Sequence, residues 1–185
     1  MLPRCSLFVF TAGQIFGQQV GISLSSASAT PGSIAALTVS TWASGGVRPA
    51  ILQWTVEYPA DVTGIDVSPG PAAVNAGKNI TCSYLVSVAT CVAWGENQTT
   101  IADGAVATAT FQISAISRNS SIAINSRGSA SDGQGNSLPV SNTAGMINLI
   151  LPPVITCAPN SGPRLLNQYY SAQCSVSLHH FSRGQ

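Results

Sequence analysis

Short runs of alternating apolar and polar residues, separated by glycine and proline, constrain the fold of this chain more than any other feature. The clearest run is residues 50–59, AILQWTVEYP. Its apolar side is Leu52, Trp54, Val56 and Tyr58, and its polar side is Gln53, Thr55 and Glu57. Successive side chains of a β-strand point to opposite faces, so this alternation predicts a strand that buries the first set and exposes the second.

Runs of the same kind recur along the chain and favour an all-β fold. Threonine, valine, isoleucine and serine fill them, whereas Lys78 is the only lysine and Glu57 and Glu96 are the only glutamates. Strong helix formers are therefore scarce, and residues that suit a pleated strand dominate. The runs lie at 20–28, 33–43, 50–59, 80–88, 90–96, 97–117 and 146–151, with shorter ones within 61–79 and around 122–124. Their spacing predicts a β-sandwich of about nine strands without an amphipathic helix.

The same alternation predicts which side chains form the core. We expect seven to be buried: Leu37, Val39, Trp54, Phe111, Ile113, Ile122 and Ile124. Trp94 shares a face with Val92, so it too is predicted to lie in the core. Trp42 ends a run beside the turn ASGG and is the best candidate for an exposed aromatic ring among the three tryptophans, although packing at the rim of the core is the expected outcome for it too.

The chain is expected to contain three segments. Residues 1–19 are interpreted as a secretory signal peptide, because Arg4 precedes a short apolar run and small residues follow it. A stray N-terminal strand is the alternative. Residues 20–151 would form the sandwich, and residues 152–185 would form a linker and a truncated second β module. A signal peptide implies a protein that is secreted, extracellular or held at the cell surface.

Cysteine usage agrees with export. Four of the five cysteines form two local pairs, Cys82 with Cys91 and Cys157 with Cys174, and Cys5 lies in the expected signal peptide. Neither pair has the C-x-x-C spacing of a zinc site, so two disulfides are the simplest interpretation. Four buried free thiols are the alternative.

The order of these signals over residues 20–151 resembles that of cohesin modules. VGISLSSASATPGSIAALTVS is similar to the family's first two strands and their turn, and ILQWTVEYP resembles its third strand. TTIADGAVATATFQIS is similar to the family's acidic-Gly turn and the strand after it, and GSASDGQGNSLPVSNTAGMINLI resembles its ending. The resemblance implies a nine-stranded jelly-roll β-sandwich that binds a dockerin module, in polysaccharide-degrading or surface assemblies. The residues after 152 resemble an immunoglobulin-like bacterial surface module.

Candidate partner-binding residues follow from this resemblance. In the family, the third strand belongs to the sheet that meets the dockerin. The outward residues of ILQWTVEYP and of the run SIAIN are therefore the candidates: Gln53, Thr55, Glu57, Ser121, Ala123 and Asn125. Cohesins share their architecture with carbohydrate-binding modules, so polysaccharide is the alternative ligand, with Trp42 as the ring that would stack on sugar. A structural spacer in a surface protein is a third interpretation.

Charge and composition argue against several other functions. Only 7% of residues are charged and the basic residues are scattered singly, so we expect no nucleic-acid partner. No apolar run reaches the roughly 18 to 20 residues of a membrane helix. The six acidic residues lack the surroundings of a sugar-cleaving pair, and His179 and His180 lie in the tail. We therefore expect a non-catalytic module with no metal and no cofactor.

Overall fold

A computed structural model describes residues 17, 19–158 and 173–177 of the chain. Of the expected signal peptide, only residues 17 and 19 are described. The two histidines of the tail lie outside the described residues. The strands of the main body are β1 (Gln19–Leu24), β2 (Ala27–Ala29), β3 (Ile34–Ser44), β4 (Ile51–Glu57), β5 (Val62–Pro69), β6 (Asn79–Leu85), β7 (Val88–Trp94), β8 (Gly104–Ile113), β9 (Ser121–Ser131), β10 (Ser137–Leu138), β11 (Val140–Thr143) and β12 (Gly145–Leu149). A short helix, α1 (Pro71–Asn75), lies between β5 and β6.

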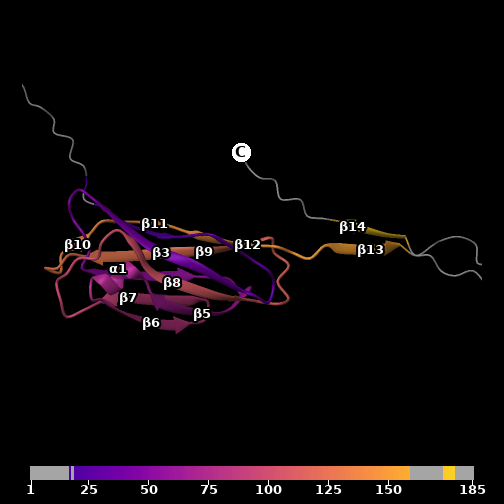
Figure 1. The fold of residues 1–185 in the computed structure, drawn as a ribbon, viewed down its shortest axis with the longest axis horizontal. Coiled ribbons are helices and arrows are strands. Elements are labelled where there is room, and N and C mark those ends of the chain that lie inside the picture. The colour runs from indigo at the N-terminus through magenta and orange to yellow at the C-terminus, as the bar shows by residue number, and fades with distance from the viewer. Residues whose placement is uncertain (1–16, 18, 159–172, 178–185) are drawn as a thin grey trace, which may run out of the picture.

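The main body is a sandwich of two sheets, which confirms the predicted all-β architecture. A five-stranded sheet has the order β11-β1-β3-β8-β5, and a seven-stranded sheet has the order β2-β12-β9-β4-β7-β6, with β10 paired to β9. Figure 1 shows these strands along the long axis of the molecule. The strand segments outnumber the nine expected because β2, β10 and β11 are pieces of two to four residues that the alternation signal does not resolve.

Both ends of the sandwich domain pass from one sheet to the other. β1 pairs in parallel with β11 in the five-stranded sheet, and β2 pairs in parallel with β12 in the seven-stranded sheet. Only two residues separate β1 from β2, and one separates β11 from β12. Each terminal segment therefore contributes a strand to both layers and connects the two sheets along one edge.

The core between the sheets is the one that the alternation predicts. All seven expected side chains are buried, and Trp54 and Phe111 are the largest that are fully enclosed. Tyr58 packs against the core and meets Phe111 edge to face, with ring centroids 6.2 Å apart. Such an arrangement sets the positive edge of one ring against the negative face of the other. Residues of β4 thus alternate as predicted, with Leu52, Trp54 and Val56 inside.

The prediction that Trp94 lies in the core is wrong. Its side chain is 43% exposed, because the inward face of β7 consists of Ala89, Cys91 and Ala93. Trp94 and Val92 do share a face, but that face points outward. The indole instead lies against the edge strand β6, where its Nε1 donates a hydrogen bond to Thr81 Oγ1 at 3.0 Å.

The expectation of no helix also needs a correction, because α1 is present. Its first residue is Pro71, whose fixed φ and missing N–H suit the first helical turn. Ala72 and Ala73 are its buried residues. Gly77, with φ +64°, follows the end of the helix. A helix of five residues shows too little periodicity to be recognised among the surrounding glycine and proline.

Cys82 and Cys91 form the predicted disulfide. They are cross-strand partners in β6 and β7, with Cα atoms 4.1 Å apart. Beyond the sandwich, β13 (Val154–Ala158) and β14 (Gln173–Ser177) pair in a separate two-stranded sheet. Its register sets Cys157 directly opposite Cys174, and the disulfide between them stays a prediction. Among the described residues, no helix is long and apolar enough to cross a membrane.

Candidate functional site

The six candidate partner-binding residues lie on the outward side of the seven-stranded sheet, which we call the outer face. β4 and β9 are adjacent antiparallel strands in this sheet, and their register sets Glu57 opposite Asn125. Ser121 and Ala123 continue the outward side of β9 past the end of β4, where their partners are Asn148 and Met146 of β12. Thr55 and Glu57 are half-buried, whereas the other four are exposed. The structure therefore brings the two predicted runs together on one surface.

Most of the middle of the outer face is polar and carries one ion pair. The Thr55 and Thr90 hydroxyls, on β4 and β7, form a hydrogen bond of 3.0 Å. Glu57 accepts a hydrogen bond from Arg127 Nη2, and this is the one ion pair among the described residues. The Arg127 side chain is 75% exposed, so solvent screens the pair and it contributes at most about 1 kcal/mol to stability.

Arg127 is a site residue that the sequence prediction missed. It continues the outward series of Ser121, Ala123 and Asn125 at the same two-residue spacing, so the signal was present in the alternation. Its partner Glu57 lies seventy positions away, and only the register of β4 against β9 reveals that they meet.

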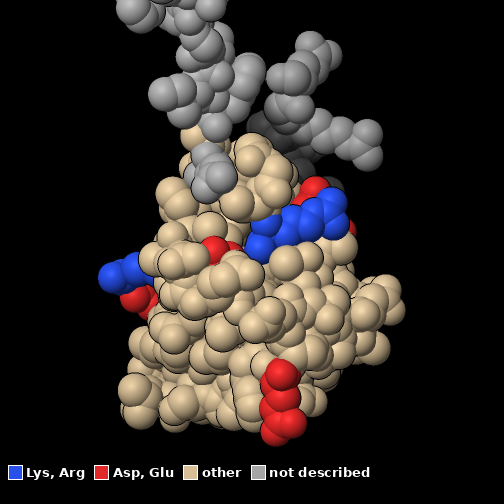
Figure 2. All heavy atoms as spheres, turned by 90° about the vertical axis from the view of Figure 1, so that its left-hand side faces the viewer, with Lys and Arg blue, Asp and Glu red and all other residues tan. Residues whose placement is uncertain are grey.

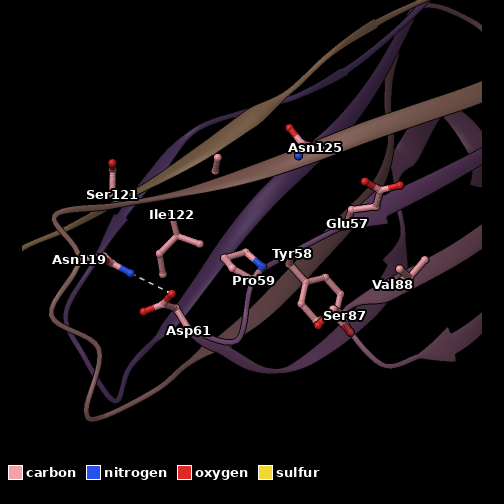
Figure 3. Close-up of a pocket in the computed structure, with 11 residues that line it drawn as sticks. Glu57, Tyr58, Pro59, Asp61, Ser87, Val88, Asn119, Ser121, Ile122 and Asn125 are labelled. Carbon is pink, nitrogen blue, oxygen red and sulfur yellow. Dashed lines mark hydrogen bonds between the residues drawn. The ribbon is translucent and has the colours of Figure 1, made fainter.

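A hollow of about 520 Å³ lies at the end of the outer face where β4 leaves the sheet. Four of the six candidates line it: Glu57, Ser121, Ala123 and Asn125. Figure 3 shows Ser121 and Asn125 on one side of the hollow and Ser87 and Val88 on the other, with Tyr58 and Pro59 between them. The hollow is therefore walled by the end of β4 and the connection that follows it, by the β6–β7 turn with the start of β7, and by the first half of β9 with the connection that precedes it.

Asp61 fixes the wall of the hollow that leads into β9. Its Oδ1 accepts a hydrogen bond from Ser117 Oγ at 2.5 Å, and its Oδ2 accepts one from Asn119 Nδ2 at 3.0 Å. Figure 3 shows the second of these bonds. Its backbone oxygen accepts a further bond from Ser114 N, 2.7 Å long. Because both carboxylate oxygens are engaged, Asp61 holds the β8–β9 connection in place beside the hollow.

The β6–β7 turn presents apolar side chains next to the hollow. Leu85 is 72% exposed and Val86 is 94% exposed. Ser87, at the turn, has φ +61°, and its carbonyl accepts a 3.0 Å hydrogen bond from Tyr58 N. The Cys82–Cys91 disulfide joins the two strands of the same hairpin. The tip is thus held in position although its side chains face solvent.

Trp42, the candidate for sugar stacking, lies on the five-stranded sheet, on the opposite side of the sandwich from the six candidates. Its cross-strand partner in β1 is Gly21, and a Cβ added to Gly21 would lie 2.0 Å from the indole ring atoms. The ring therefore lies directly over the glycine backbone. It is 44% exposed, so Trp42 is an exposed aromatic residue and not one enclosed at the rim of the core.

The remaining charged groups are dispersed over the surface. Figure 2 shows a few blue and red side chains on an otherwise uncharged end of the molecule. In the DGQGNS turn, the Asp132 carboxylate accepts hydrogen bonds from Gln134 N, Asn136 N and Asn136 Nδ2. These bonds hold the pKa of Asp132 below its ordinary value, with Asn136 the largest cause. The carboxylate is thereby committed to its own turn.

Comparison with known proteins identifies the fold. No family model matches the chain, and no curated protein sequence matches it. A non-cellulosomal cohesin from the archaeon Archaeoglobus fulgidus has a TM-score of 0.59 and 20% identity, covering 71% of this chain and 91% of its own. The cohesin of a Clostridium thermocellum OlpA cohesin–dockerin complex has a TM-score of 0.62 and 15% identity, covering 71% and 99%.

A third structure gives the same result. The sixth cohesin of Acetivibrio cellulolyticus scaffoldin B, solved in complex with a Cel5 dockerin, has a TM-score of 0.58 and 18% identity, covering 72% of this chain and 99% of its own. The sandwich therefore has the cohesin fold, which confirms the resemblance drawn from the sequence. The resemblance of the residues after 152 to an immunoglobulin-like module stays a prediction.

Proposed function

We propose that this chain is a non-catalytic binding module that captures a protein partner of the dockerin type on its outer face. The observation that carries the proposal is the outer face itself, which joins a mostly polar middle with one ion pair to a hollow and an exposed apolar tip. The comparisons support the kind of partner, because cohesins of the same fold are solved in complex with dockerins.

The chemistry of the outer face suits a protein surface. Protein interfaces combine a well-packed centre that is poor in charge with a polar rim. Here the side chains of Thr55, Thr90 and Ala123 are small, so a partner can approach the sheet closely. Glu57 and Asn125 offer hydrogen-bonding groups at the mouth of the hollow, and Leu85 and Val86 offer apolar area beside it.

The setting that we propose is outside the cell, in an assembly that degrades polysaccharide or decorates a surface. The Cys82–Cys91 disulfide supports this, since structural disulfides persist mainly in oxidising compartments. The expected signal peptide at residues 1–19 belongs to the same proposal.

Polysaccharide binding is the second candidate function, and one observation favours it. The Trp42 ring lies over Gly21 and is 44% exposed, so part of it is available to stack on sugar. This surface belongs to the five-stranded sheet, so the two candidate functions use opposite sides of the molecule and can be separated by mutation. A structural spacer would use neither surface.

The test compares two variants of the full chain as bait in the secreted fraction of the source organism. Thr55→Ala combined with Glu57→Ala should weaken capture of a partner that mass spectrometry identifies as carrying a dockerin-type module. The double variant loses one hydroxyl hydrogen bond and one screened ion pair, so its free energy of unfolding should change by only about 1 kcal/mol. Trp42→Ala, on the opposite sheet, is the matched control and should capture the partner normally.

Two results would contradict the proposal. Undiminished capture by the Thr55→Ala, Glu57→Ala variant would remove the outer face as the binding surface. Retention on insoluble polysaccharide, abolished by Trp42→Ala and without any protein partner, would establish the second candidate instead.

A further inference from the structure

The only lysine of the chain is buried beside an asparagine side chain, away from the outer face. Lys78 lies between α1 and β6 and is 4% exposed. Its Nζ donates hydrogen bonds to the backbone oxygen and to the side-chain Oδ1 of Asn97, each 2.9 Å long. Among the described residues, no carboxylate lies within ion-pair distance of it. A buried ammonium group without an opposite charge is costly, so this placement needs an explanation.

The surroundings hold the Asn97 amide in one orientation. Thr99 N donates to Oδ1 at 3.0 Å, and Nδ2 donates to the Gly77 oxygen at 3.1 Å. Gly95 makes the close packing possible, since a Cβ there would lie 2.9 Å from the Gly77 oxygen and 3.2 Å from Lys78 Cδ. The amide therefore presents its carbonyl to the lysine, with its NH2 group turned toward Gly77.

We propose that Lys78 and Asn97 form an intramolecular isopeptide cross-link. The hydrogen bond from Nζ to Oδ1 holds the lysine nitrogen next to the Asn97 amide, so that after loss of a proton a small rotation of the lysine side chain would turn the nitrogen lone pair toward Cγ. Lysine is a nucleophile once it loses its proton, and burial lowers the pKa of Lys78 from its ordinary value, which enriches the free amine. The Thr99 N–H that already binds Oδ1 would stabilise the negative charge that develops there.

The reaction balances without any co-reactant. The Lys78 Nζ–Cγ bond forms, and the Cγ–Nδ2 bond of Asn97 breaks. Two protons of the lysine ammonium pass to the leaving NH2 nitrogen, which departs as ammonium, and the third stays on the new amide nitrogen, so no atom is oxidised or reduced. The product is a neutral secondary amide, and the uncompensated buried charge disappears with the reaction.

The cross-link would reinforce the hairpin that carries part of the outer face. Lys78 immediately precedes β6, and Asn97 follows β7 after a short connection. The Cys82–Cys91 disulfide lies between these two positions. Two nested covalent ties would then hold β6, which is the edge strand of its sheet, against β7.

Trypsin digestion of the denatured and reduced full chain tests the proposal directly. Between Arg4 and Arg118, Lys78 is the single effective cleavage site, because Arg48 is followed by Pro49. A free Lys78 yields separate peptides ending at 78 and spanning 79–118. A cross-linked Lys78 resists trypsin, so we expect one peptide spanning 5–118, or from a processed N-terminus to 118, lighter by one ammonia than its sequence.

Lys78→Arg is the control, because it keeps the positive charge and the cleavage site but cannot form the link. It should yield the two separate peptides at full mass. Wild-type protein that is cleaved after residue 78 at full mass would overturn the proposal. Loss of ammonia together with cleavage after residue 78 would also overturn it, since that pattern indicates cyclisation of Asn97 on its own backbone. The wild-type digest decides the question even if the variant fails to fold.

Discussion

Replacement of Trp54 tests whether the outer face is oriented as described. Trp54 is 1% exposed, and its cross-strand neighbours are Cys91 on β7 and Gly128 on β9. Trp54→Ala removes a fully buried ring from between the sheets and leaves a cavity, so we expect a loss of about 3 to 5 kcal/mol in the free energy of unfolding.

A second substitution separates the ring from its polar atom. The indole Nε1 of Trp54 is buried and has no hydrogen-bond partner among the described residues. Burying such a donor costs about 1 to 3 kcal/mol, and Trp54→Phe removes that cost while shrinking the side chain. The two effects oppose each other, so we expect Trp54→Phe to destabilise the protein by less than about 1.5 kcal/mol.

Urea unfolding followed by far-ultraviolet circular dichroism is the appropriate assay, because Trp42 and Trp94 would confuse a fluorescence signal. The midpoint should fall at unchanged slope if only stability changes. Trp94→Ala is a matched control at an exposed position and should cost clearly less than Trp54→Ala. A loss below about 1 kcal/mol for Trp54→Ala would mean that β4 is flipped and that Thr55 and Glu57 point inward.

Two further predictions concern the disulfide of the β6–β7 hairpin and the turn that follows β9. Replacing Cys82 and Cys91 together by serine should lower the free energy of unfolding by about 2 to 4 kcal/mol. Thiol titration of the unreduced, unfolded wild type should find no free thiol at Cys82 or Cys91. Reactive thiols at both positions would contradict the disulfide. Asp132→Ala should lower the thermal midpoint at neutral pH, and the difference from wild type should vanish in acid. The sign follows because a carboxyl whose pKa is lowered by folding stabilises the protein above its unfolded pKa and loses that effect as the pH falls through the folded pKa. A difference that persists at low pH would assign the effect to packing.

Alternation correctly predicted the position of the central strands and the direction in which their side chains point. There the size of the apolar residues and their alternation with polar residues indicate the same orientation. In β4 and the first half of β9 the inward residues are large and apolar and the outward residues are mostly polar or small, so only one orientation buries Trp54, Ile122 and Ile124. In β7 both sides are weakly apolar. Trp94 and Val92 are the larger set, but the structure buries Ala89, Cys91 and Ala93. Hydrophobicity alone could not decide between them, because the choice depends on which neighbours fill the space between the sheets.

The candidate site was predictable as a surface but not as a set of contacts. The sequence places Glu57 and Asn125 on outward positions, yet their pairing depends on the register between strands that are far apart in the chain. The ion pair of Glu57 with Arg127 depends on the same register, whereas the contact of Lys78 with Asn97 depends on the pairing of β6 with β7. The hollow depends on where β4 leaves the sheet and on the Asp61 hydrogen bonds that hold its wall. Alternation within a single sequence predicts which way a side chain points, but it does not predict which residues of two strands lie opposite each other.

The position of each strand in its sheet explains how the outer face could bind without rearrangement. β4 is hydrogen-bonded on both sides, by β9 and β7, and Trp54 anchors it to the core from below. Thr55 and Glu57 therefore project from a backbone that has little freedom left to lose, and a partner that contacts them pays a small ordering cost. β6 is an edge strand with mostly exposed side chains, so its tip would be mobile without the disulfide. It follows that opening the disulfide should weaken contacts made through Leu85 and Val86 more than contacts made through Thr55 and Glu57. The polar contacts of Thr55 and Glu57 therefore rely on the pairing of β4 with both of its neighbours, whereas the apolar contacts of Leu85 and Val86 rely on the disulfide.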